Sequence, residues 1–286
     1  MKTAIIAAAL LAVVSTDASA ATIFGVDENN NLVTFDSASP GTFLSSVRIT
    51  GADSSFQALD FRPLNNVLYG LSADRVVHTI DTVTGVAMAV SGALPIDGSV
   101  FGFDFNPTID RVRIVSNTDN NYVFNPNDGS LTGAPTTTSL GYASGDINAG
   151  RNPGVSAAAY TSSTFGAAGS STQLYVIDTD NDVLARQNNN GGVLNTVGSL
   201  GADLGSRTSF DIVGNDAFAF NGTTLYRADL NTGQLTSVGQ TNRALFGIAI
   251  AAVPEPGTWG MMILGFGVVG YAMRRRKAMI RFPQAI

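Results

Sequence analysis

The sequence predicts an all-β protein in which about five four-stranded blades form a β-propeller, preceded by a signal peptide and followed by a transmembrane helix. Two observations in residues 21–250 predict the propeller. Short apolar phrases recur at intervals of about 45, 44, 62 and 43 residues, the usual range of blade lengths. The same region has no lysine and a single glutamate, Glu28, but much aspartate, asparagine and glycine, which favours strands and tight turns over helices.

The first 20 residues have the features of an export signal. Lys2 gives a positive start and residues 4–14 are apolar. Ala18 and Ala20 form the small-x-small pattern that precedes signal cleavage. We therefore expect the mature chain to begin at Ala21.

The repeats themselves follow one plan. Each unit begins with a short strand, expected at 23–25, 68–70, 112–114, 174–176 and 217–219. A second strand follows at 32–36, 77–81, 122–125, 183–185 and 225–229, then a turn such as Thr84-Gly85 and a third short strand. Each unit closes with a further strand at 58–61, 102–105, 144–147, 209–212 or 246–250. Four short alternating strands separated by turn residues are typical of a blade.

The third interval is longer than the others. It is rich in glycine, serine and alanine between residues 141 and 171, where we expect an extra strand pair or a surface excursion. A six-bladed ring, or an open arrangement of the same meanders, is therefore the alternative to five blades.

The tail, residues 251–286, contains an uncharged stretch at 258–273. Its 16 or so residues fall slightly short of the roughly 20 that a helix needs to cross a bilayer. Trp259 lies near one end, and Arg274, Arg275 and Arg276 follow the other as a stop-transfer signal that should stay in the cytoplasm. By these features alone the tail is an ordinary single-span anchor.

The order of residues in the tail supports a more specific interpretation. Pro254, Glu255 and Pro256 precede Trp259, the apolar run and the arginines, and together they resemble the PEP-CTERM sorting signal of Gram-negative bacteria in its tryptophan-bearing variety. Two features depart from that variety, namely Gly260 in place of the usual alanine and nine further residues, 278–286, after the basic cluster.

The resemblance implies a processing partner and a location. An exosortase, a membrane-embedded transpeptidase-like protease, would cut near the Pro-Glu-Pro sequence while the tail is held transiently in the inner membrane. The body would then lie at the cell surface or outside the cell. Without processing, it would stay anchored to the membrane with the body in the periplasm.

The body has a resemblance of its own. The phrases Leu-Tyr-Gly-Leu at 68–71, Ile-Asp-x-x-Thr-Gly at 80–85 and Phe-Gly-Phe-Asp-Phe-Asn-Pro at 101–107 resemble an exported bacterial repeat family classed as a domain of unknown function. This family often accompanies PEP-CTERM tails. The resemblance covers most of residues 21–250 and implies a propeller-like body without assigned activity.

Composition excludes several function classes. The body holds ten of the 16 basic residues and 20 of the 22 acidic ones, so its net charge is near −10 and we expect no nucleic-acid partner. The absence of cysteine excludes disulfides, zinc–thiolate sites and thiol catalysis. His78, the single histidine, lies in an alternating strand with no G-x-S-x-G elbow near it. We predict no catalytic residue.

Two sets of aspartates are candidate metal ligands. Asp178, Asp180 and Asp182 resemble the start of a calcium loop, but Val183 and Asn189 occupy the places of the EF-hand glycine and glutamate. The same place in two other units carries similar residues, so a hairpin turn explains the pattern best and a weak calcium site is the alternative.

The second set closes four units and consists of Asp60, Asp104, Asp146 and Asp211. At equivalent positions of a propeller these residues form a ring, in which carboxylates share a cation or repel one another. The alternative, which repetition favours, is that each accepts backbone N–H groups at a connection between blades, ahead of Pro63 or Pro107. We predict no cofactor, and calcium is the candidate ion.

Three functions from different classes remain open. The first is an exported surface or extracellular-matrix protein whose non-catalytic propeller binds exopolysaccharide or other surface proteins. The second is a propeller hydrolase or lyase that uses a divalent cation held by aspartates. The third is a module that binds a small ligand.

Overall fold

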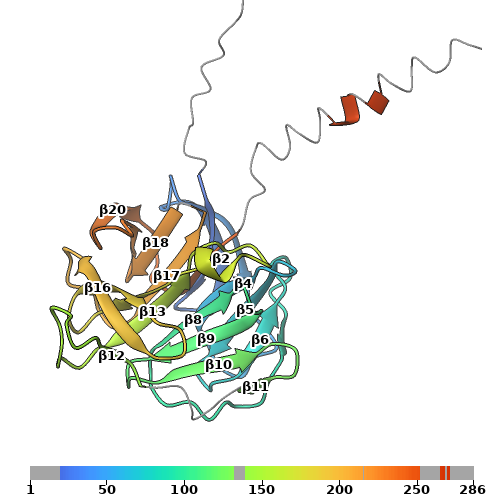
Figure 1. Cartoon of the computed structure of the whole chain (residues 1–286). Coiled ribbons are helices and arrows are strands. Elements are labelled where there is room, and N and C mark those ends of the chain that lie inside the picture. Colours follow the sequence, from blue (N-terminus) through green and yellow to red (C-terminus); the bar gives the residue numbers. More distant parts are fainter. Residues whose placement is uncertain (1–19, 132–138, 215, 252–264, 268, 271–286) are drawn as a thin grey trace, which may run out of the picture. The chain divides into compact units, whose positions relative to one another are not determined.

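The computed structural model describes residues 20–131, 139–214 and 216–251, together with short helical pieces at 265–267 and 269–270 (Figure 1). The chain divides into two units, Met1–Ala251 and Ala252–Ile286. Residues 1–19 of the predicted signal peptide and most of the predicted transmembrane segment at 258–273 lie outside the described residues. Among the residues that are described, no helix is long and apolar enough to cross a bilayer.

The described part of the body forms five antiparallel blades, which confirms the predicted all-β propeller (Figure 1). Blade 1 has the order β21-β1-β2-β3, with β21 at Leu245–Ile250, β1 at Thr22–Asp27, β2 at Asn31–Asp36 and β3 at Phe43–Arg48. Blade 2 consists of β4 (Phe56–Arg62), β5 (Val67–Ser72), β6 (Val77–Ile80) and β7 (Ala87–Ala89). Blade 3 consists of β8 (Phe101–Asn106), β9 (Arg111–Ser116), β10 (Asn121–Asn125) and β11 (Ser130–Leu131).

Blade 4 carries an additional edge strand. Its antiparallel strands are β13 (Val155–Tyr160), β14 (Leu174–Asp178), β15 (Val183–Gln187) and β16 (Val193–Ser199). The two-residue strand β12 (Gly141–Tyr142) pairs in parallel with β16, and a 3-10 turn, η1 (Gly169–Ser171), lies between β13 and β14. Blade 5 consists of β17 (Thr208–Val213), β18 (Asp216–Asn221), β19 (Thr224–Ala228) and β20 (Leu235–Gln240).

In four of the five predicted repeats, the closing strand is the innermost strand of the next blade. We call β21, β4, β8, β13 and β17 the inner strands, because each lies at one end of its sheet and packs against the inner strands of the blades beside it. The last of them, β21, pairs with β1 from the beginning of the body. The ring is therefore closed by hydrogen bonds between strands from opposite ends of the domain.

The prediction for the last strand of the third unit was wrong. Residues 144–147, expected to form its closing strand, are in a turn in which Asp146 N–H donates to the Ala143 carbonyl and Ala149 N–H donates to the Asp146 carbonyl. The inner strand of blade 4 is β13 instead, at Val155–Tyr160. The long third interval thus holds both β12 and β13 and adds no sixth blade to the described ring.

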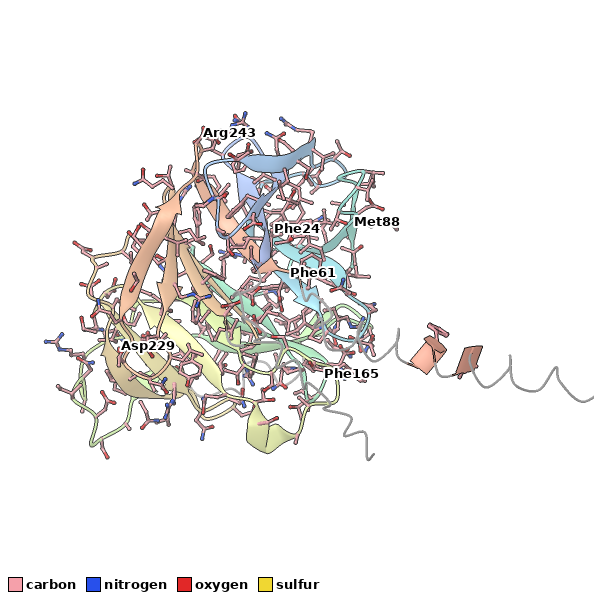
Figure 2. All side chains as sticks on the ribbon, turned by 90° about the horizontal axis from the view of Figure 1, so that it is seen from above. Phe24, Phe61, Met88, Phe165, Asp229 and Arg243 are labelled. Atoms are coloured by element: carbon pink, nitrogen blue, oxygen red, sulfur yellow. The ribbon has the colours of Figure 1, made fainter. Side chains whose placement is uncertain are left out.

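The hydrophobic core is divided among the contacts between blades. Five clusters of buried apolar side chains each join two neighbouring blades, and the cluster around Phe35, Phe218 and Phe220 joins blade 5 to blade 1. Phe24 on β1 and Phe61 on β4 pack edge to face with their centroids 5.1 Å apart, whereas Met88 lies at the rim of blade 2 and is 67% exposed (Figure 2). No blade buries its faces alone, so the ring is the folding unit.

The inner strands approach one another closely where side chains are small. A Cβ atom built on Gly102 of β8 would lie 2.6 Å from the backbone nitrogen of Ala158 on β13. One on Gly247 of β21 would lie 3.0 Å from the Cα of Ala58 on β4. Five inner strands can therefore meet around a narrow axis.

Candidate functional site

The inner strands create a hydrogen-bonding problem at the propeller axis. Each has a strand partner on one side only, so N–H groups on its other edge need acceptors from elsewhere. Buried N–H groups without an acceptor are costly, by about 1–3 kcal/mol each. The polar groups nearest the axis decide how this cost is avoided.

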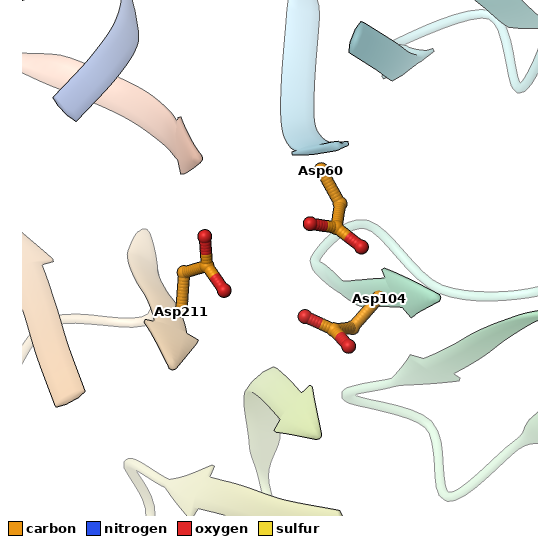
Figure 3. Close-up of side chains that lie close together, drawn as sticks. All are labelled: Asp60, Asp104 and Asp211. Atoms are coloured by element: carbon orange, nitrogen blue, oxygen red, sulfur yellow. The ribbon is translucent and has the colours of Figure 1, made fainter. Parts of the chain in front are cut away.

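Three of the four repeated aspartates lie at this axis. Asp60, Asp104 and Asp211 are carried by β4, β8 and β17, and their carboxyl groups point toward a common centre (Figure 3). One oxygen from each lies within 4.8 Å of the others. The three residues are 7%, 4% and 3% exposed, respectively. We call them the axial aspartates.

Each axial aspartate bridges to an inner strand of the following blade. Asp60 Oδ2 accepts the N–H of Phe105 on β8 at 2.6 Å, and Asp104 Oδ1 accepts the N–H of Tyr160 on β13 at 3.0 Å. Asp211 Oδ2 accepts the N–H of Ile250 on β21 at 2.6 Å. These hydrogen bonds link blade 2 to 3, blade 3 to 4, and blade 5 to 1.

Two further backbone bonds complete the ring. Asp211 Oδ1 accepts the N–H of its own neighbour Ile212 at 2.6 Å, and Asp60 likewise accepts from Phe61. Three carboxylates thus satisfy one N–H on every inner strand, those of Phe61, Phe105, Tyr160, Ile212 and Ile250. These hydrogen bonds support the structural interpretation of the repeated aspartates.

Burial raises the pKa values of all three groups, and repulsion between carboxylates adds to this for Asp60 and Asp104. The pKa of Asp60 is well above its usual value because of burial and the charge of Asp211, and the pKa of Asp104 is well above it because of burial and the charges of Asp60 and Asp211. Burial raises the pKa of Asp211 to about 6, although the N–H groups of Ile250 and Ile212 favour its charged form. The cluster therefore retains protons near neutral pH unless a cation replaces them.

Asp146, the fourth predicted member, is not part of the cluster. Its carboxylate accepts the N–H and hydroxyl of Thr196, both at 2.6 Å, and the N–H of Asn148 at 2.9 Å. These hydrogen bonds outweigh its burial and lower the pKa of Asp146. On β13 the place of the aspartate is taken by Ala159, and on β21 by Ala249. The ring of carboxylates is thus three-membered.

The Asp178–Asp182 segment forms the β14–β15 turn, as the hairpin interpretation predicted. Asp178 accepts the N–H groups of Gly154, Asp180 and Asn181, each at 3.0 Å, and the Tyr142 hydroxyl. Asp182 has a positive φ of 51°, as a tight turn requires. Asp27 holds the β1–β2 turn in the same way, by accepting from the N–H groups at positions 29 and 31.

His78 lies on β6, 4% exposed, with its ring edge to face against Phe56 at 5.3 Å. Its Nδ1 lies 3.2 Å from the Val76 carbonyl oxygen. Burial lowers the pKa of the imidazole. The side chain is far better placed to fill the space between strands than to reach a substrate.

Sequence reasoning missed a pocket at one mouth of the axis. This mouth pocket has a volume of about 200 Å³ and lies where β4, β8, β17 and β21 begin; its walls include Gln57, Phe101, Arg207, Thr208 and Phe246. A second, much smaller cavity of about 10 Å³ lies between the inner strands of all five blades and shares Gln57 and Phe101 with the mouth pocket. That volume admits about one water molecule.

Comparison with protein families identifies the body. A family model described as a domain of unknown function, DUF4394, matches residues 31–249. The chain belongs to the DUF4394 family. A model of the PEP-CTERM protein-sorting motif matches residues 252–277, which confirms the resemblance of the tail and implies export and processing by an exosortase. The predicted sorting residues lie outside the described residues: Pro254, Glu255, Pro256, Trp259, Arg274, Arg275 and Arg276.

Other comparisons add little to this DUF4394 protein. No curated protein matches it. Among solved structures, a chain from the crystal structure of a nidogen/laminin complex is similar at 10% sequence identity and a TM-score of 0.49. The match covers 80% of this chain and 98% of the other.

Proposed function

We propose that this protein is an exosortase-sorted surface or extracellular-matrix protein whose propeller binds a neighbouring polymer or protein without catalysis. The observation that carries the proposal is the use of the axial carboxylates. All three accept backbone N–H groups and are at most 7% exposed. A carboxylate that touches no substrate cannot act on it as acid, base or nucleophile.

The sorting motif supports the location. Mass spectrometry of the protein from fractionated cells tests it. We expect a mature chain that begins at Ala21 and ends near Pro256, in the surface or medium fraction. A chain that retains Arg274 to Ile286 in the membrane fraction would contradict exosortase processing.

Binding without turnover needs a second experiment. The full chain is mixed with exopolysaccharide from the producing cells, the polymer is sedimented, and the supernatant is analysed for fragments by mass spectrometry. We expect the protein to sediment with the polymer and no fragments to be released. Release of fragments by the protein, abolished in Asp104→Asn, would contradict a non-catalytic role.

One observation favours a second candidate, a divalent-cation-dependent hydrolase or lyase. The three axial carboxylates have oxygens within 4.8 Å of one another, and three oxygen ligands of this kind suit calcium. A cation would also neutralise the repulsion that raises their pKa values. A calcium-dependent rise in melting temperature, lost in Asp104→Asn and accompanied by turnover, would favour this candidate. The same rise without turnover would indicate a structural ion.

A further inference from the structure

The mouth pocket is built by residues at one level of the inner strands. Gln57, Phe101, Thr208 and Phe246 each lie three positions before the axial layer, which on the four strands consists of Asp60, Asp104, Asp211 and Ala249. The mouth pocket at this level has a volume of about 200 Å³, whereas the cavity between the inner strands has a volume of about 10 Å³. Pockets for drug-sized ligands measure roughly 300–1,000 Å³, so this one suits a single sugar-sized unit.

Two of these residues, Gln57 and Phe246, lie at β-bulges. The register of β4 against β5 shifts between Phe56 and Ala58, which makes Gln57 the extra residue. The register of β1 against β21 skips Phe246 in the same way. A bulge leaves its extra residue outside the regular pairing and redirects the side chain. Both of these residues line the pocket.

Gln57 presents an unused acceptor to the pocket. Its Oε1 is buried and has no hydrogen-bond partner among the described residues. A buried carbonyl oxygen of this kind requires a donor. Because Gln57 lines both the pocket and the smaller cavity, the missing donor is best supplied from the pocket, by water or by a ligand hydroxyl.

Arg207 supplies hydrogen-bond donors to the same pocket. Its guanidinium lies over the Phe246 ring, 4.8 Å from the centroid, and forms no ion pair within the described part of the chain. Stacking occupies the flat face and leaves the N–H groups at the edge, where a carboxylate can bind with two parallel hydrogen bonds. Arg207 is the only charged side chain among the described residues that line the pocket.

The loop that carries Arg207 is held in place. Asn221 Nδ2 donates to the carbonyls of Gly205 and Arg207, at 2.9 and 3.2 Å, and to the Thr208 hydroxyl at 2.9 Å. These hydrogen bonds hold the backbone of residues 205–208, which carries the Arg207 side chain. Less conformational entropy is then lost when a ligand binds.

We propose that the mouth pocket binds a six-carbon sugar acid, with its carboxylate on Arg207, a hydroxyl donating to Gln57 Oε1 and an apolar ring face against Phe101. This inference rests on the proposed binding function and names its ligand class. The free sugar acid and the end residue of an acidic polysaccharide share this chemistry.

Isothermal titration of the full chain with D-glucuronate, D-glucose and D-glucosamine tests the proposal. We expect binding of glucuronate, with glucose at least tenfold weaker and glucosamine weaker still. A glucuronate-terminated oligosaccharide that binds more tightly than the monosaccharide identifies a polymer end as the natural source, and the reverse order identifies the free acid.

Two variants and a matched control keep the test specific. Arg207→Gln should weaken glucuronate binding at least tenfold and leave the melting temperature unchanged. Gln57→Leu should also lose binding and unfold at the same or a higher temperature, because it removes an unpaired buried oxygen. Arg227→Gln is the control, since Arg227 lies over Phe218 at 5.5 Å but outside the pocket, and it should bind as the unchanged protein does.

Three outcomes would overturn the inference: no binding of glucuronate, equal binding of glucose and glucuronate, or unchanged binding in Arg207→Gln. If the protein still sediments with exopolysaccharide in any of these cases, the proposed binding function remains supported. If the protein binds neither glucuronate nor exopolysaccharide, both the proposed function and this inference are wrong.

Discussion

At the scale of single residues, Asp211 shows how one side chain links two blades. Its two oxygens accept the N–H groups of Ile212 on its own strand and of Ile250 on the strand that closes the ring. The sequence indicates that this aspartate recurs and that its role is structural. Which N–H groups it meets depends on how neighbouring blades pack, and no local pattern in the sequence contains that information.

Removing this acceptor should destabilise the domain. In Asp211→Ala two buried N–H groups lose their acceptor, and we expect the free energy of unfolding to fall by about 2–4 kcal/mol in urea denaturation. Asp211→Asn keeps one acceptor oxygen and removes a charge that faces Asp60 and Asp104, so it should cost clearly less. Asp203→Ala, on an exposed loop, is the control and should stay within about 0.5 kcal/mol of the unchanged protein. Equal stability of Asp211→Ala and the unchanged protein would refute the role.

At the scale of elements, the sequence predicted most strands because their turns are chemically distinct. Asp27 and Asp178 hold equivalent hairpins, and each is the acidic residue that ends an apolar phrase. The inner strand of blade 4 was missed because β13 carries Ala159 where three other blades carry aspartate, while Asp146 supplied a false match nearby. The mouth pocket was missed because its walls come from strands of four different blades. Two of its residues also lie at bulges, which arise from the pairing of two strands and leave no mark in either one alone.

The close approach of inner strands gives an element-scale prediction. Gly102→Ala places a Cβ 2.6 Å from a backbone nitrogen of β13, which a side-chain rotation cannot relieve. We expect a loss of about 1–3 kcal/mol in the free energy of unfolding. Gly141→Ala on β12 is the matched control, because nothing lies within 4 Å of its built Cβ, and it should change stability little. The prediction fails if both substitutions have the same effect.

At the scale of the whole molecule, the five blades depend on one closing strand. β21 pairs with β1, contributes to the clusters that join blade 1 to blades 2 and 5, and supplies the Ile250 N–H to Asp211. The repeat pattern predicted the ring, and the apolar phrase at 246–250 was the sign of its last strand. This strand completes the first blade because the other four blades already have an inner strand and β1 still has a free edge.

Truncation separates the closing strand from the tail. A chain that ends after Arg243 should not unfold cooperatively, since it lacks β21 and leaves one edge of β1 and two interblade clusters exposed. A chain that ends after Ala251 retains all five blades and should melt at the same temperature as the longer protein. Circular dichroism during heating measures both. Cooperative unfolding of the shorter chain at an unchanged temperature would show that closure contributes nothing.

The axial aspartates also make stability depend on pH. Their pKa values are raised in the folded protein, that of Asp211 from 3.8 to about 6, so the folded state binds more protons than the unfolded state above pH 4. The contribution of Asp211 is complete below about pH 4 and is lost as the pH rises through about 6, a change that corresponds to about 3 kcal/mol. Asp60 and Asp104, whose pKa values are also raised, change stability in the same direction. The lowered pKa values of Asp27 and Asp146 act oppositely, because their contribution is lost as the pH falls below about 4.

We therefore expect the melting temperature in EDTA to fall between pH 5 and pH 7.5. Asp211→Asn should flatten that fall, because it removes one of the three interacting carboxyl groups. Asp81→Asn, at an exposed turn remote from the axis, should leave the slope unchanged over this range. A melting temperature that is constant or rises from pH 5 to pH 7.5 would mean that the three carboxyl groups do not hold protons in the folded state. If saturating calcium abolishes the fall, a cation replaces those protons, because a bound ion stabilises the charged carboxylates that high pH produces.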